Sequence, residues 1–311
     1  MRKVWNYVTQ HLKEDFNVTV YTLTFLFLAV SIYLNYRFDF EDSYLDTRPE
    51  QQRILFYFLW HCIAYYVPVA LYAGIRKARV FHSRSFWFRS LLALLLLSIY
   101  RSLPYFDNLI NQLANRQTLY YMYKIGKNMA GVLILIFPLL LFYWKSDRDK
   151  GYRYGLNANQ FDFKPYFVML LMMLPLITAA SFLPDFQQQY PRYESTSAHL
   201  YFGVDEWVVA VIYELTYGIN FVSIEFFYRG FLVMGMMQVL GRNSVLSMAS
   251  LYCFLHFGKP MGEAVSSIFG GFILGAIAYQ TRSIWGGVIV HVGIAWLMEL
   301  AAYLQGLFRA P

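Results

Sequence analysis

The sequence predicts an all-α fold, a polytopic membrane bundle of about eight or nine transmembrane helices. Hydrophobic residues make up 58% of the 311 residues and charged residues only 14%, whereas soluble domains carry roughly 25% charged residues. Several apolar runs approach the ~20 residues that a helix needs to cross a hydrocarbon layer. The net charge of +7 lies in short loops between these runs, where basic residues orient membrane helices. We therefore expect the lipid bilayer, and no nucleic acid, as a partner.

Nine apolar segments are expected to form the spans. The third segment is short and contains Arg101 and Pro104, so we expect it to be broken, because proline interrupts helices. The seventh and eighth segments are also short, and Pro260 separates them. In chain order the segments cover residues 17–36, 54–74, 90–104, 128–144, 166–184, 207–232, 243–257, 264–280 and 285–305.

Loop charges predict the orientation of the spans. The loops at 75–89 and 145–155 are rich in lysine and arginine, so both are expected on the cytoplasmic side. The loops at 37–53 and 185–206 hold more acidic than basic residues and fit the outer side. The chain has two cysteines, without disulfide or metal spacing, and no clear targeting segment. We therefore expect an integral membrane protein of the bacterial inner membrane.

Ionisable residues within apolar segments concentrate in the second half of the chain. We interpret residues 1–160 as an N-terminal helical membrane region of unassigned role and residues 161–308 as the working bundle. The sequence lacks the inverted repeat of hydrophobic segments that would indicate a transporter. The ionisable residues in question are Glu214, Glu225, Arg229, His256, His291 and Glu299.

Glu225 and Arg229 lie in the segment SIEFFYRGFL, four residues apart. On a helix this spacing places both side chains on one face, where they can pair. A charge at bilayer depth costs about 2.5–3.5 kcal/mol on insertion scales, so such residues are candidates for a functional site. The alternative is a structural ion pair that fixes the packing of helices.

Two histidines and a further glutamate extend this set of candidates. His256 ends an apolar run, His291 lies inside the last one, and Lys259 and Glu263 flank Pro260. Neutral imidazole is a good general base, and a buried carboxylate can accept a proton from water. These groups suit the hydrolysis of an amide bond. The alternatives are buried histidines bonded to carbonyls and a solvated loop that carries Glu263.

We expect no cofactor in this protein. Two histidines and a carboxylate would make a three-ligand zinc site with one open position. The sequence has no HExxH motif and no closely spaced histidines, so the pattern does not favour zinc.

At these residues the sequence resembles the CPBP family of intramembrane proteases, also called the CAAX prenyl protease 2 or Abi family. The family motifs EExxxR, FxxxH and HxxxN/D correspond in order and spacing to IEFFYR, YCFLH and HVGIA, within residues 160–305. The resemblance implies an all-helical bundle in which a glutamate and a histidine activate water. It further implies that a second histidine and an asparagine stabilise the oxyanion, and that no catalytic metal is needed.

The sequence departs from the family pattern at Ile224, Tyr252 and Ala295. Ile224 replaces the glutamate that is usually assigned as the base, and Ala295 replaces the asparagine. We therefore hypothesise that Glu225 or Glu263 supplies the carboxylate, with His256 as the base or water-positioning group. His291 would stabilise the oxyanion.

Two functions follow from this reading. The first is an endopeptidase that cuts a membrane-anchored peptide or protein, with Arg229 either paired to Glu225 or bound to a carboxylate of the substrate. The alternative is an inactive relative that binds a membrane partner as a scaffold or immunity protein.

Overall fold

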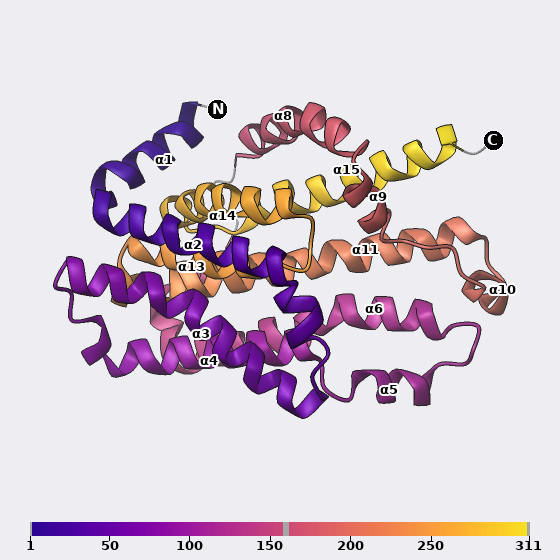
Figure 1. Cartoon of the computed structure of the whole chain (residues 1–311), viewed down its shortest axis with the longest axis horizontal. Coiled ribbons are helices and arrows are strands. Elements are labelled where there is room, and N and C mark those ends of the chain that lie inside the picture. The colour runs from indigo at the N-terminus through magenta and orange to yellow at the C-terminus, as the bar shows by residue number, and fades with distance from the viewer. Residues whose placement is uncertain (1, 158–161, 310–311) are drawn as a thin grey trace.

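The computed structural model describes residues 2–157 and 162–309, and within these ranges its regular elements are all helical. The predicted all-α bundle is therefore confirmed. The predicted boundary between residues 160 and 161 lies outside the described residues. In Figure 1 most of the longer helices run close to the longest axis of the molecule.

The helices follow one another with short connections. The α-helices are α1 (Arg2–Asp15), α2 (Val18–Phe38), α3 (Glu50–Ile75), α4 (Arg84–Ser102), α5 (Phe106–Leu113), α6 (Leu119–Gly131), α7 (Phe137–Phe142), α8 (Lys164–Ala180), α9 (Pro184–Gln189), α10 (Ala198–Phe202), α11 (Glu206–Glu225), α12 (Met237–Leu240), α13 (Asn243–Phe254), α14 (Met261–Thr281) and α15 (Trp285–Arg309). The π-helical segments are η1 (Glu41–Leu45), η3 (Val132–Ile136), η4 (Tyr143–Asp147) and η7 (Phe226–Gly235), and the 3-10 segments are η2 (Val80–His82), η5 (Arg148–Lys150) and η6 (Arg153–Gly155).

Six helices of the described chain are long and apolar enough to cross a membrane. They cover Val18–Phe38, Glu50–Ile75, Leu119–Lys150, Glu206–Gly235, Met261–Thr281 and Trp285–Leu307. The pair formed by α4 and α5, which is bent by 48°, adds a seventh candidate and corresponds to the broken third segment.

The remaining two of the nine expected segments form shorter helices, which are not among these candidates. α8 has 17 residues and is apolar. α13 has 12 residues, and at 1.5 Å per residue it is about 18 Å long. The structure therefore has fewer span candidates than expected. For α13 the reason is that an apolar run that ends inside the protein has the same composition as a short span.

α13 lies in the centre of the bundle. Each of its residues is buried, and it packs against α3, α14 and η7. Ser250 donates a hydrogen bond from Oγ to the carbonyl of Ala64 at 2.7 Å, which ties α13 to the first half of the chain. In contrast, α2, α3 and α8 expose large apolar side chains such as Leu26, Leu55 and Leu171, as lipid-facing helices do.

The chain turns sharply after α13 and places His256 inside the protein. α13 ends at Phe254, and α14 begins directly after Pro260, whose missing N–H suits a position before the first helical turn. Residues 255–260 therefore form a short connection between two helices that pack against each other.

Candidate functional site

Glu225 and Arg229 form an ion pair where α11 passes into η7. Nη1 of Arg229 lies 2.8 Å from Oε1 of Glu225, and the two side chains are 1% and 0% exposed. Removing either charge from such a buried pair leaves the other uncompensated. The ten residues of η7 are all buried, and π-helical turns occur frequently at functional sites.

Gly287 allows the last helix to approach Glu225. A β-carbon at this position of α15 would collide with Oε2 of Glu225. The glycine therefore lets the backbone of α15 close on the carboxylate and bring His291, one helical turn later, to the same place.

His291 bridges Glu225 and Tyr252. Its Nδ1 lies 3.1 Å from Oε1 of Glu225, and its Nε2 lies 3.2 Å from the hydroxyl of Tyr252. The ring packs on Phe221, with centroids 4.3 Å apart. Because a carboxylate only accepts hydrogen bonds, this geometry places the proton of neutral His291 on Nδ1. Nε2 then accepts from Tyr252.

His256 lies on the other side of Tyr252. Its Nδ1 is 2.9 Å from the backbone carbonyl of Tyr252, and the two rings meet edge to face with centroids 4.6 Å apart. A carbonyl oxygen cannot donate, so Nδ1 carries the proton and Nε2 keeps its lone pair. His256 is 8% exposed.

Tyr252 is therefore the residue around which the three motifs meet. Its hydroxyl contacts the third motif through His291, its carbonyl contacts His256, and the guanidinium of Arg229 lies 4.4 Å above its ring. The hydroxyl is what distinguishes this residue from the phenylalanine of the family motif.

The turn that carries His256 is held by the first half of the chain. Tyr36 of α2 donates its hydroxyl to the carbonyl of Lys259 at 2.6 Å and to that of His256 at 3.3 Å. Asn35 donates from Nδ2 to the carbonyl of Phe257 at 3.3 Å. The end of α2 thus supports the backbone from the site histidine to residue 259.

Glu263 forms its contacts with Lys259 and Tyr190, outside the cluster around Tyr252. It lies 3.3 Å from Nζ of Lys259, and its carboxylate accepts from the hydroxyl of Tyr190 at 3.2 and 3.4 Å. Burial lowers the pKa of Lys259, and Glu263 opposes this effect. The structure therefore brings Glu225, Arg229, His256 and His291 together, whereas it joins Glu263 to Tyr190 at the end of α9.

The two substituted motif positions are apolar and buried. Ile224 is 5% exposed and belongs to the main core, while Ala295 is 5% exposed and packs with Tyr213, Tyr217 and Phe221. Neither position offers a polar group, so the polar part of the site consists of the residues that surround Tyr252.

Sequence reasoning missed the role of Tyr252 and of residues 35–36. The replacement of phenylalanine by tyrosine was visible, but the partner of its hydroxyl lies 39 residues further along the chain. The contact from Tyr36 to the His256 carbonyl spans 220 residues. The signal in the sequence for residues 35–36 is that both are polar and lie at the end of an apolar span.

The site residues do not fit a three-ligand zinc centre. No group of three histidine, cysteine, aspartate or glutamate side chains in the described part of the chain could hold a metal ion.

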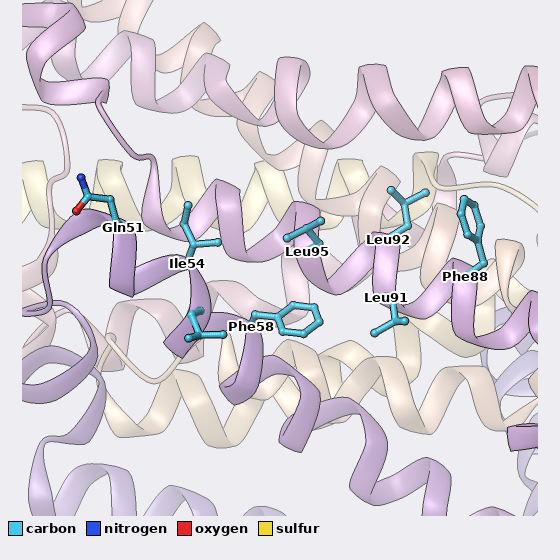
Figure 2. Close-up of a pocket in the computed structure, with 8 residues that line it drawn as sticks. Gln51, Ile54, Phe58, Phe88, Leu91, Leu92 and Leu95 are labelled. Carbon is cyan, nitrogen blue, oxygen red and sulfur yellow. The ribbon is translucent and has the colours of Figure 1, made fainter.

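A separate groove of about 620 Å³ lies between α3 and α4 and is lined by apolar residues together with Gln51 (Figure 2). None of the site residues lines this groove.

Comparison with known proteins supports the resemblance drawn from the motifs. Residues 206–297, under a third of the chain, match the family model described as type II CAAX prenyl endopeptidase, Rce1-like, which is consistent with the CPBP family. No curated protein and no solved structure matches the chain. At the family level the match supports a CAAX-type intramembrane protease, and together with the spans it supports an integral membrane protein.

Proposed function

We propose that this protein, whose residues 206–297 match the Rce1-like family, is an intramembrane endopeptidase. Its substrate is a membrane-anchored peptide or protein, and water activated by the site histidines and glutamate hydrolyses the peptide bond. The bacterial inner membrane remains a prediction for its location.

One observation carries this proposal: a continuous chain of contacts joins Glu225, His291, Tyr252 and His256. These residues come from three segments that are distant in sequence, and each belongs to one of the three motifs. Ionisable residues at membrane depth favour a functional site over a purely structural one.

His256 is the best candidate for the general base. Its Nδ1 proton is fixed by the carbonyl of Tyr252, so its Nε2 can take a proton from water. His256 is 8% exposed, whereas Glu225 is 0% exposed. Water can therefore reach the imidazole more readily than the carboxylate.

Glu225 acts as an orienting group in this proposal. It accepts the Nδ1 proton of His291, in the way that a carboxylate behind a catalytic imidazole fixes its tautomer and orientation. Arg229 compensates its charge. Glu263 is the less favoured carboxylate because Lys259 and Tyr190 occupy it.

An inactive, partner-binding protein is the second candidate. It is favoured by Ile224, which places an apolar side chain in the core at the position of the usual base. In that case Glu225 and Arg229 would be a structural pair that survives without catalysis.

Reconstituted vesicles that contain the purified protein would separate the two candidates. The probe is an internally quenched peptide ending in a CAAX sequence with a farnesylated cysteine. The endopeptidase predicts cleavage that His256→Ala abolishes, Glu225→Gln reduces and Glu263→Gln leaves near the wild-type rate. A chelator should leave the rate unchanged. Absence of cleavage by the wild-type protein would support the inactive, partner-binding function.

A further inference from the structure

We propose that Tyr252 is a further catalytic residue, which donates its phenolic O–H to the carbonyl oxygen of the scissile peptide bond. This inference rests on the proposed endopeptidase function and deepens it. The position carries phenylalanine in the family motif, so the donor is a feature of this chain.

The protonation of His291 shows why another donor is needed. Its Nδ1 hydrogen points to Glu225, and its Nε2 accepts from Tyr252. A neutral histidine with this tautomer offers no hydrogen on Nε2 to a developing oxyanion. Ala295, one helical turn later, offers none either. The O–H of Tyr252 is the remaining donor, held against Nε2 of His291.

Tyr252 is also held in a fixed orientation. The Arg229 guanidinium lies over its face at 4.4 Å, and the ring of Tyr228 meets it edge to face with centroids 5.0 Å apart. The ring of His256 also packs against it, with centroids 4.6 Å apart. The residue itself is 4% exposed. A ring held in this way keeps its phenolic oxygen in one place, and donors with fixed positions stabilise developing charge in oxyanion holes.

The reaction then proceeds in two balanced steps. Nε2 of His256 takes a proton from water while the water oxygen bonds to the carbonyl carbon, and the π electron pair moves to the carbonyl oxygen. The Tyr252 hydroxyl turns its hydrogen from Nε2 of His291 to this oxyanion and keeps its proton. The C=O bond then re-forms, the C–N bond breaks, and His256 returns the proton to the leaving nitrogen.

The test compares Tyr252→Phe with Tyr65→Phe in the farnesylated-peptide assay. Both changes remove one buried phenolic oxygen, and the Tyr65 hydroxyl of α3 has no hydrogen-bond partner among the described residues. Tyr252→Phe should lower kcat by about 10²–10³-fold, the usual effect of losing an oxyanion donor, with KM within about threefold. Tyr65→Phe should keep the wild-type kcat. Melting temperature and elution volume verify that both variants fold.

Inhibitor binding separates a donor from a residue that only positions His291. A peptidyl aldehyde, whose hydrate resembles the tetrahedral intermediate, should bind Tyr252→Phe more weakly by about the same factor as kcat falls. The matching peptidyl alcohol should bind both proteins equally. Equal weakening of aldehyde and alcohol would refute the donor role.

The assay also distinguishes this inference from the function on which it rests. If the wild-type protein cleaves, His256→Ala is inactive and Tyr252→Phe matches the wild-type rate, only the donor role is wrong. If the wild-type protein cleaves nothing, both the endopeptidase and the donor role are refuted.

Discussion

The backbone of Gly287 lies directly against the carboxylate of Glu225, so that even a methyl group at residue 287 would overlap Oε2. This contact sets the distance between α15 and the start of η7. It therefore determines whether His291 can reach Glu225.

We expect Gly287→Ala to impair the site. The added methyl group must displace the Glu225 carboxylate, and overpacking of this kind costs about 1–3 kcal/mol. The contacts of Glu225 with Arg229 and His291 would lengthen, so peptidase activity should fall together with resistance to SDS unfolding. Gly306→Ala on the same helix is the matched control, because a β-carbon there meets no atom within 4 Å. Equal behaviour of the two variants would contradict the role of Gly287.

Much of the site could be predicted from local spacing. Glu225 and Arg229 are four residues apart, and this spacing alone places them on one helical face. The histidines could be singled out because ionisable groups in apolar runs are uncommon. These features depend only on residues within one or two helical turns.

The remaining features of the fold and the site depend on contacts between segments that are distant in sequence. The periodicity of the sequence carries no information on such contacts. The end of α13 inside the bundle could not be read from composition, because residues 243–257 are as apolar as a short span. The engagement of Glu263 by Tyr190 joins positions 73 residues apart. Sequence reasoning therefore kept Glu263 as a candidate, while the structure places it beside Lys259.

Tyr36→Phe should lower activity although residue 36 lies outside the matched segment. The variant loses the hydroxyl that bonds the carbonyls of His256 and Lys259. A hydrogen bond of this kind contributes about 0.5–1.5 kcal/mol, and a small displacement of His256 reduces catalysis further. We expect kcat to fall by about tenfold, measured in reconstituted vesicles. Tyr33→Phe, on the same helix and 64% exposed, should have no effect on the rate. An unchanged rate for Tyr36→Phe would show that catalysis does not depend on the hydrogen bonds from Tyr36 to the turn that carries His256.

Glu41 should make stability depend on pH. Burial raises its pKa from 4.5 to about 7, and the neighbouring Arg101 opposes this rise. The folded protein therefore holds this proton more tightly than the unfolded chain. The contribution is fully present below pH 4.5, and it is lost as the pH rises through 7.

Melting temperatures between pH 4.5 and 8 would test this dependence. The wild-type protein should lose up to about 3 kcal/mol across this window relative to Glu41→Gln, given 1.36 kcal/mol per pKa unit. The variant carries an amide that does not titrate, so its pH profile should be flatter. Parallel profiles would show that Glu41 does not titrate in this range.

A buried ion pair between α4 and η4 should be the most sensitive polar contact outside the site. Arg89 contacts both oxygens of Asp147, with Nη1–Oδ2 at 2.5 Å and Nη2–Oδ1 at 2.7 Å. Asp147 also accepts from Tyr154 and pairs with Lys150. The Asp147 side chain is 0% exposed, so its neutralisation would leave buried positive charges without compensation.

Asp147→Asn should therefore destabilise the protein by about 3–5 kcal/mol, the usual cost of breaking a buried pair by removing one partner. The measurement is unfolding in SDS or by heat in detergent. Lys3→Ala provides the comparison, because the pair of Lys3 with Asp162 is largely exposed at 72% and 46% and exposed pairs contribute little. Similar losses in the two variants would mean that water, and not Arg89, compensates the charge of Asp147. A large loss of unfolding free energy in Asp147→Asn alone would instead show that the contact between α4 and η4 stabilises this end of the bundle.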